Sequence, residues 1–456
     1  MRNKPVSERC RGLLWLLSDE RGATAVLVAI ALPVLFAFGA LAINSGFWYT
    51  MKRQNQSAAD AAALSGAYEV MAGSSSTRIT AAVNEAATQN GWVNTGTAPA
   101  VNVSYSNPPL VPSGVEVKLW QDQGSLFAYV PFTGATIATR AVALVKKLDN
   151  PCMVLLNQTA SKELNIQGSA SLTMPDCSIV ADSSASDSIY AQGANNSILT
   201  ADTIITAGQV STTGQPRLTL TNPAQIGAPY YADPYASTLT HTFLTTGMPT
   251  ACATTNPPPQ NQTTNYSGPL KFCGGLDIKK ATVNLAPGTY WITDGDLTLE
   301  SNSVLECTTC VAGGAGVTII LTTAQASGGI VGNVTQQSNA VVDNLNAPNS
   351  GTFAGLLLIQ DSNGLPTGTT YTKDCGSTNP PCSTFQGTPG QTLNGLVYFP
   401  NTDMTFQGNP TTGSNSCLMV VANTVKLAGN SSLATSGCVS GGPGSPPTVS
   451  TVALAE

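Results

Sequence analysis

The feature that most constrains this chain is a run of 30 residues, from Gly22 to Met51, that contains no charged side chain. A helix crosses the hydrocarbon core of a bilayer with about 20 apolar residues. The apolar centre of the run is Ala23–Ile43, and Phe47, Trp48 and Tyr49 follow it. Aromatic residues of this kind gather at the membrane–water interface. We therefore predict a transmembrane helix over residues 22–51, in contact with membrane lipid.

A cleavable secretory signal is the alternative interpretation of this run. A signal has an apolar region of about 7–15 residues and a small-residue cleavage site, whereas this run is longer and continues into a helix-forming segment. A retained anchor is therefore favoured. Because five basic residues precede the run and two follow it, the N-terminus is expected on the cytoplasmic side. We predict a cytoplasmic segment over residues 1–21 and a single-pass protein.

Charge is scarce in this chain and unevenly distributed. Charged residues make up 10% of it, and the 12 basic and 22 acidic residues after Arg53 give that part a net charge of −10. Because nucleic-acid binding requires a basic surface, we expect no nucleic-acid partner. Hydrophobic residues, 42% of the chain, come in short runs between polar turns. This pattern favours a mainly β, extracytoplasmic body.

Ten of the eleven cysteines lie beyond the membrane segment. An even number on one side of a membrane indicates an oxidising compartment and disulfide bonds. Sequence does not fix which cysteines pair, but pairing between neighbours is the simplest prediction. The predicted pairs are Cys152–Cys177, Cys252–Cys273, Cys307–Cys310, Cys375–Cys382 and Cys417–Cys438.

The segment after the membrane run is rich in alanine and predicts a helix over residues 52–90. Ala59, Ala63 and Ala67 recur at near-helical spacing, and Asp60 lies beside them. Such a flat face suits close helix packing, with Asp60 either solvated or a polar contact of that face. A high-propensity continuation of the membrane helix explains the same pattern equally well.

The stretch from Glu20 to Ala67 combines three features. It has an Arg-Gly-small-small-Ala-Val start, an apolar helix with a central proline, and a Gln-x-Ala-Ala-Asp-Ala-Ala-Ala-Leu-x-Gly-Ala run. With these features it resembles the N-terminal region of the tight-adherence (Tad/Flp) pilus-assembly family, TadE/TadG-like. Type IV prepilins carry a Glu five residues after the cleavage Gly, but counting from Gly22 this position is Leu27. The resemblance therefore implies the TadG-like branch, an uncleaved protein with a large periplasmic part.

The resemblance also implies a function. It points to a bacterial inner-membrane protein that acts in pilus assembly, anchoring or adhesion, with other Tad/Flp pilus-assembly subunits as partners. Strands are predicted at 115–121, 126–132 and 138–145. Together with the alanine-rich helix they would form a small pilin-like α+β domain over residues 52–149. We expect this domain to dock onto other subunits.

Residues 150–438 contain short apolar runs that recur between small polar residues, and they are predicted to form the body. Three segments share a template, in which two apolar residues six positions apart flank small polar residues: Ile166–Leu172, Leu299–Leu305 and Leu427–Leu433. Short apolar strands separated by Gly, Asn or Ser turns are typical of solenoids. We predict a right-handed parallel β-helix, with a β-sandwich as the alternative.

Two segments interrupt the repeating pattern of the body. Residues 221–268 are rich in Pro, Thr and Asn, and residues 362–391 contain the loop between Cys375 and Cys382. Both are predicted as loop insertions. The last segment, residues 439–456, is predicted to be a flexible tail because Gly, Pro and Ser dominate its start.

The sequence offers few candidates for chemistry. His241, the one histidine, has no triad-like motif around it and is predicted to be a surface residue on a long loop. Cys307 and Cys310 have the spacing of a redox or zinc motif, but there is no second CxxC, and a structural disulfide is favoured. We predict no catalytic residue, no metal ligand and no cofactor.

A membrane-tethered β-helix that binds carbohydrate or degrades polysaccharide is the alternative function. Asp294 and Asp296 alternate onto one strand face, and Lys279 and Lys280 are expected on the preceding rung. If these side chains shared one groove, an enzyme would be favoured; if scattered, it would be disfavoured. The abundant Ser, Thr and Asn residues also suit contact with cell-envelope carbohydrate.

Overall fold

The computed structural model describes most of the chain from residue 20 to residue 455. The described ranges are 20–72, 74–94, 99–105, 114–124, 134–149, 151–193, 196–325, 329–362, 365–366, 382–387, 391–409, 417–435, 444 and 448–455. The chain divides into two compact units. We call Met1–Lys146 with Ser450–Glu456 the N-terminal domain, and Lys147–Val449 the body. In sequence, the body is therefore inserted into the N-terminal domain.

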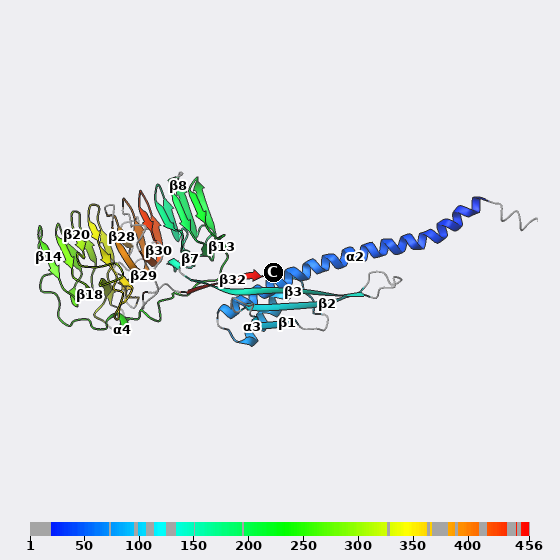
Figure 1. Ribbon diagram of the computed structural model, residues 1–456, viewed down its shortest axis with the longest axis horizontal. Coiled ribbons are helices and arrows are strands. Elements are labelled where there is room, and N and C mark those ends of the chain that lie inside the picture. Colours follow the sequence, from blue (N-terminus) through cyan, green and yellow to red (C-terminus); the bar gives the residue numbers. More distant parts are fainter. Residues whose placement is uncertain are drawn as a thin grey trace, which may run out of the picture. The chain divides into compact units, whose positions relative to one another are not determined.

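One uninterrupted helix, α2 (Glu20–Met71), contains the apolar run and most of the alanine-rich segment (Figure 1). Its apolar side chains are exposed, and Leu35 and Phe36 are 69% and 70% accessible. Among the described helices, only α2 is long and apolar enough to cross a membrane. Pro33 lies inside it, as membrane helices tolerate. These properties suit a membrane anchor or a signal segment.

The predicted single helix over residues 52–90 is wrong in one respect, because two helices form there. α2 ends at Met71, and α3 spans Ser76–Gln89. Ser75 is the N-cap of α3, and its hydroxyl accepts a hydrogen bond from Arg78 N at 3.4 Å. Serine favours this position because it satisfies a backbone N–H that has no partner within the helix.

The sheet of the N-terminal domain has the strand order β1-β2-β3-β32. Its strands are β1 (Ala100–Tyr105), β2 (Gly114–Gly124), β3 (Gly134–Asp149) and β32 (Thr448–Ala455). β2 pairs antiparallel with β1 and β3. The strands predicted at 115–121 and 138–145 are confirmed by β2 and β3, whereas 126–132 lies outside the described residues. The flexible tail expected over 439–456 is wrong for its last part, because β32 completes this sheet.

Every strand pair described in the body is parallel. The largest described sheet contains 18 strands: β4 (Pro151–Leu155), β5 (Leu164–Gln167), β7 (Ser178–Ala181), β8 (Ile189–Gly193), β10 (Ile204–Thr206), β11 (Val210–Gly214), β13 (Gln225–Ile226), β15 (Leu270–Cys273), β16 (Leu276–Ile278), β18 (Gly288–Thr293), β19 (Leu297–Leu299), β21 (Val317–Thr322), β23 (Val334–Gln336), β25 (Leu345–Asn346), β26 (Leu356–Gln360), β28 (Cys382–Phe385), β29 (Leu393–Phe406) and β30 (Leu418–Leu427).

Three smaller parallel sheets complete the body. Their strands are β6 (Ser171–Met174), β9 (Ile198–Ala201), β12 (Arg217–Leu220) and β31 (Ser432–Ala434) in one sheet, β14 (Thr263–Tyr266), β17 (Thr282–Leu285), β20 (Val304–Glu306) and β24 (Val341–Asp343) in another, and β22 (Ile330–Val331) with β27 (Leu365–Pro366) in the third. The antiparallel pairs of a β-sandwich do not occur among the described strand pairs of the body.

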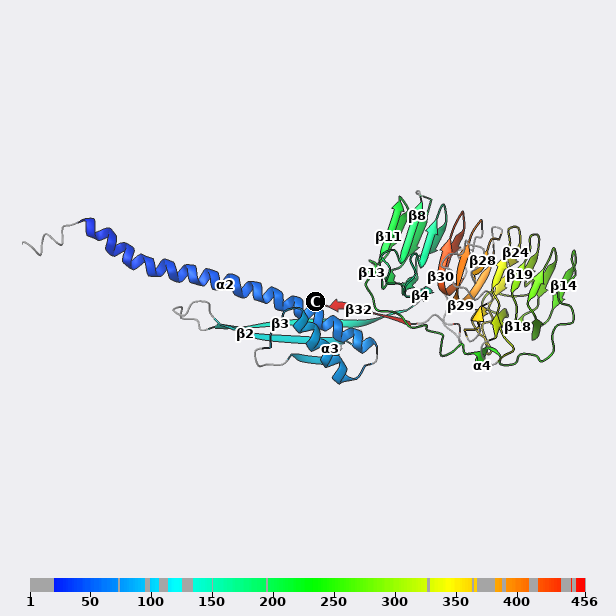
Figure 2. The ribbon, with the colours of Figure 1, turned by 180° about the vertical axis from the view of Figure 1, so that it is seen from behind.

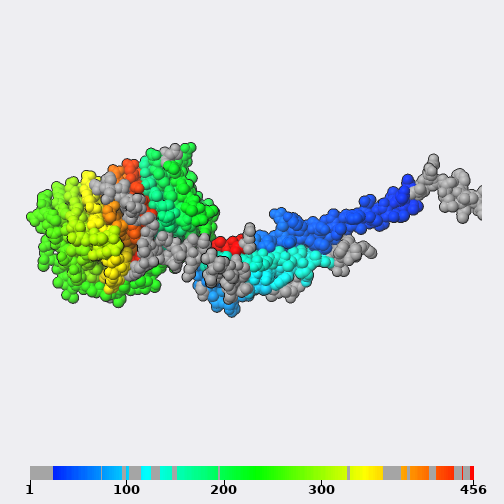
Figure 3. Space-filling view, in the orientation of Figure 1, coloured from blue at the N-terminus to red at the C-terminus, as the bar shows by residue number. Residues whose placement is uncertain are grey.

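The strands of the body do not stack in sequence order. Along one side, the order is β13-β10-β7-β4-β30-β29-β26-β21-β18-β15. The chain therefore enters at the middle of the stack, builds outward to β13, and resumes at the opposite end with β15. The bands of Figure 3 show this order, since yellow, orange and red lie between the two groups of green strands, and Figure 2 shows it from behind.

We call the junction of the two halves the seam. There β30 pairs with β4 and β5, and β31 pairs with β6. Two of the three template segments meet at the seam, because Leu427 lies opposite Ile166 and Leu433 opposite Leu172. These four side chains are fully buried in the interior of the body. The template thus marks a strand–turn–strand corner with both apolar residues inside.

A column of glycines lines one corner of the stack and crosses the seam. A Cβ on Gly429 would lie 3.1 Å from Gly408 O, and one on Gly168 would lie 3.3 Å from Gly429 O. Gly193 and Gly214 continue the column, where an added Cβ would lie 2.5 Å from Gly168 O and closer still to Gly193 O, respectively. Gly168 and Gly429 also have φ of 76° and 73°, a region that glycine adopts without strain. Glycine is therefore needed at this corner for conformation and for close stacking.

The loop insertion predicted over 221–268 is wrong at its ends, because β13 and β14 lie within it and pair in the stack. Its middle part lies across the outside of the body. We call residues 228–250 the strap, which includes the short helix α4 (His241–Leu244). Tyr235, Leu239 and Leu244 are buried in a cluster with outward-facing residues of the stacked strands. These residues come from both sides of the seam: Val154, Val180, Ile205, Trp291, Ile320, Ile359, Tyr398 and Val421. Most of the second predicted insertion, 362–391, lies outside the described residues.

We predict that Gly429→Ala destabilises the body more than Gly274→Ala. Both glycines have nearly the same φ, 73° and 76°, so the cost of the left-handed conformation is matched at about 1–2 kcal/mol. Only Gly429 has backbone atoms of the neighbouring turn within reach of the added Cβ. Chemical denaturation of the full chain in detergent, followed by far-ultraviolet circular dichroism, measures the difference. Equal losses of stability would contradict the close-stacking role.

Candidate functional site

The alanine face of α2 is filled by the N-terminal domain itself. Ala59, Ala63 and Ala67 are completely buried in a cluster with residues of α3, β2 and β3. At Gly66 an added Cβ would lie 2.7 Å from Val83 Cγ2 and 3.0 Å from Val115 Cγ1. The small residues therefore let α2 approach α3 and the sheet closely. The alanine face thus packs closely, as its spacing suggested, and its partners are elements of the same domain.

Asp60 lies at the margin of this face and is partly buried. Its Oδ1 accepts a hydrogen bond from Gln56 Nε2 at 2.8 Å. The same Nε2 donates to Arg140 O of β3 at 2.9 Å. Asp60 thus orients a glutamine that links α2 to the sheet, so it is a polar contact of the packing face rather than a fully solvated residue.

His241 holds the strap against the body. Its Nδ1 is 2.5 Å from Asp361 Oδ2, and Thr322 Oγ1 donates to the same oxygen at 2.6 Å. The His241 side chain is 17% exposed and that of Asp361 is fully buried. In a catalytic triad the imidazole lies between the acid and the nucleophile, whereas here the acid lies between the other two. The expectation of a surface residue on a long loop is wrong, because His241 begins the helix α4 and most of its side chain is covered.

The charged residues proposed for an enzyme make separate contacts with neighbouring turns. Asp294 Oδ1 accepts from Thr323 Oγ1 at 2.7 Å, and Asp296 Oδ1 accepts from Asn333 N at 2.8 Å.

Lys279 pairs elsewhere, with Asp277 at 2.9 Å and Glu300 at 3.0 Å. Lys280 lies in a turn with φ of 48°, where its backbone N donates to Ser303 Oγ at 3.1 Å. Within the described residues, no group of three or more His, Cys, Asp or Glu is arranged to hold a metal ion. These contacts of the two aspartates and two lysines are with neighbouring turns, and the contacts do not bring the four together in one groove.

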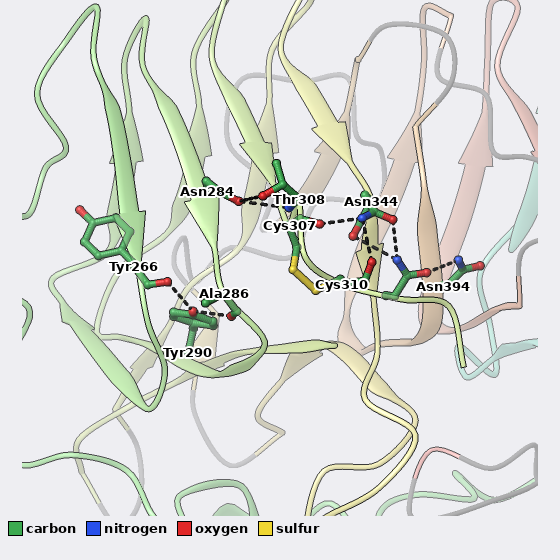
Figure 4. The surroundings of a disulfide bond; sticks show 10 residues. Tyr266, Asn284, Ala286, Tyr290, Cys307, Thr308, Cys310, Asn344 and Asn394 are labelled. Atoms are coloured by element: carbon green, nitrogen blue, oxygen red, sulfur yellow. Dashed lines mark hydrogen bonds between the residues drawn. A yellow bond between two sulfur atoms is a disulfide. The ribbon is translucent and has the colours of Figure 1, made fainter. Parts of the chain in front are cut away.

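The CxxC motif forms a disulfide inside the body (Figure 4). Cys307 is fully buried and Cys310 is 6% exposed. Asn344 Nδ2 donates to the carbonyl oxygens of both cysteines, at 2.6 and 3.0 Å. A redox-active cysteine must be accessible as a thiolate, so this buried pair acts as a structural turn.

Three of the five predicted disulfides are confirmed, namely Cys152–Cys177, Cys252–Cys273 and Cys307–Cys310. Each joins cysteines that are close in sequence. For the other two predictions, Cys375 and Cys438 lie outside the described residues. Cys382 and Cys417 are themselves disulfide-bonded.

Two buried acids of the body could not be recognised from the sequence, where nothing distinguishes them from surface acids. Glu163 is completely buried and Asp182 is 3% exposed. Ser183 N donates to Glu163 Oε2 at 2.8 Å, and Tyr231 N of the strap donates to Asp182 Oδ1 at 2.7 Å. Burial raises the pKa of Glu163 to about 8, although the Ser183 hydrogen bond opposes it. Burial likewise raises the pKa of Asp182 to about 6.

Residues 22–69 match the model of the Flp pilus-assembly TadE/G-like family. This region is a TadE/G-like pilus-assembly domain. The match lies entirely within α2 and includes its exposed apolar part and its buried alanine face. The chain matches no curated protein and no solved structure. The TadE/G-like domain therefore links the chain to the pilus-assembly machinery, and the family match does not extend into the body.

We predict that Glu163→Gln stabilises the protein at pH 8 and leaves it unchanged near pH 4. The carboxyl titrates at 4.5 when unfolded and near 8 when folded. The folded state therefore binds more protons between these values, and stability falls as the pH rises through this window. Melting temperatures of the full chain from pH 4 to 8 test this, with the exposed Asp176→Asn as control. A wild-type melting temperature that rises across this range would contradict it.

We also predict that alkylation of the intact protein labels one cysteine, and that alkylation after reduction labels eleven. The ten cysteines beyond the membrane segment should be protected as disulfides, which leaves Cys10 free. Mass spectrometry counts the labels, and Cys10→Ser should abolish labelling of the unreduced protein. Labelling of many cysteines without reductant would argue against an extracytoplasmic body.

Proposed function

We propose that this chain is a non-enzymatic, TadG-like component of Tad/Flp pilus assembly. Residues 22–51 anchor it in the bacterial inner membrane, with the N-terminus in the cytoplasm and the body in the periplasm. The observation that carries the proposal is the TadE/G-like match, which lies on the exposed apolar helix α2. The disulfides of the body support an oxidising compartment. Leu27, at the position of the prepilin glutamate, supports an uncleaved anchor.

We propose in addition that the body is a right-handed parallel β-helix. Its pairs are parallel, and successive partners such as Leu270 with Tyr290, or Ile189 with Val210, are about 20 residues apart. Connections between parallel strands of one sheet are nearly always right-handed. Inward-facing residues form one continuous apolar interior, which supports a closed stack.

In this proposal the body acts as a binding or spacing element of the assembly. Asn284 Nδ2 donates to Asn265 Oδ1 of the neighbouring strand at 2.9 Å, and this hydrogen bond lies on the exposed surface of the body. Such polar ladders offer hydrogen-bonding groups to cell-envelope carbohydrate or to protein subunits. Because the alanine face of α2 is buried, other pilus-assembly subunits would contact the remaining surface of the N-terminal domain or the body.

Deletion of the gene is expected to reduce surface pili and adhesion, because an assembly component would be missing. Electron microscopy and a surface-attachment assay measure both effects. The wild-type gene should restore them, and so should the Asp294→Asn, Asp296→Asn double variant, whose carboxylates have no catalytic role here. A chain with residues 150–447 replaced by a short Gly-Ser link should not restore adhesion. Unchanged pili and adhesion after deletion would contradict the proposal.

A further inference from the structure

The stack of the body ends at β11, β12 and β13, which we call the terminal rung. These strands pair with β8, β9 and β10 respectively. No described strand pairs with the other edge of β11 or β12. The backbone N–H and C=O groups along that edge are therefore open to a further strand, as at any sheet edge.

The inward-facing side chains of β12 are left partly uncovered. Leu218 lies opposite Leu199, and Leu220 lies opposite Ala201. Leu199 and Ala201 are 1% and 0% exposed in the interior of the body. Leu218, one layer further out, is 40% exposed. Leu218 therefore occupies an interior position of the stack, but no further layer of described strands covers it.

The neighbouring strand β13 shows the same difference in exposure between two successive layers. Ile226 lies opposite Thr206, which is completely buried. Ile226 is 61% exposed, among the more exposed large apolar side chains outside α2. The terminal rung therefore presents apolar side chains to solvent, together with the edges of β11 and β12 that no described strand pairs with.

The opposite end of the stack is closed. Tyr266 and Phe272, in the outermost strands β14 and β15, are 7% and 0% exposed. The segment 251–262 lies against them, since Tyr266 donates to Thr255 O at 2.5 Å and Ala253 packs on the interior cluster. The Cys252–Cys273 disulfide fixes this segment to β15. One end of the body thus has the cap that a solenoid needs, whereas no described segment covers the other end in this way.

We propose that the terminal rung binds the terminal rung of a second copy of this chain. Between residues 207 and 228, Arg217 is the single charged residue, so the surface offers little to a strongly charged partner. A second copy presents the same apolar side chains and open strand edges. Because a two-fold axis relates the two copies, their edges would pair antiparallel and extend the sheets across the contact. Because the other end is capped, this contact closes after two copies. The proposal concerns self-association and does not depend on the pilus role.

Sedimentation of the full-length chain in detergent tests the proposal. The wild type is expected to form a two-copy species at micromolar concentration, and Leu218→Asp is expected to raise the dissociation constant at least tenfold. Val311 is 60% exposed and lies in the turn that follows Cys310, so Val311→Asp is the matched control and should associate like the wild type. Equal melting temperatures will show that both variants fold. A single-copy wild type, or unchanged association of Leu218→Asp, would overturn the proposal.

A photo-crosslinker at Ile226 identifies the occupant directly. Isotope-labelled and unlabelled chains are mixed, so that mass spectrometry separates crosslinks between two copies from crosslinks within one chain. Crosslinks between copies that join residues 207–228 support the proposal. Crosslinks from Ile226 to residues 20–149, or to a different protein, would overturn it.

Discussion

The pairing of β30 with β4 and β5 at the seam is the interaction on which the rest of the body depends. It joins residues near 420 to residues near 153, so the intervening chain forms one closed loop. The entropy cost of closing a loop grows only with the logarithm of its length. The pairing of ten-residue β30, the adjoining β31–β6 pair and the buried leucines on both sides offset that cost. Without the seam, each half would expose another unpaired rung.

The strap reinforces the seam with a different kind of contact. Its first part is held by Asp182, on one half of the body. Further along, Asp233 accepts from Tyr398 OH at 2.7 Å, and His241 meets Asp361, both on the other half. Because each contact includes a buried polar group, losing one would leave its partner unsatisfied at a cost of about 1–3 kcal/mol. The strap, although its composition is that of a loop, thus connects the two halves of the body and stabilises both.

The parts of the fold that depend on neighbouring residues could be predicted from the sequence. The apolar run, the strands in β2 and β3, the corner template and three disulfides all have partners close in sequence or a periodic pattern. The seam could not be predicted, because no local pattern specifies that Leu427 lies opposite Ile166. His241 was expected at the surface and Glu163 was not recognised, because both are covered by elements that are distant in sequence. The spacing of the alanines predicted a packing face, but the sequence did not show that α3 and the sheet of the same domain cover it.

The strand β32 sets the order of events during synthesis. It is the outer strand beside β3 in the N-terminal domain, yet about 300 residues of the body separate the two in sequence. At the usual rate of translation this interval lasts roughly 15–60 s. Throughout that time α2 is already made, while the edge of β3 has no partner. Only a chain translated through β32 can complete the sheet, so products that stop within the body carry an open edge on β3.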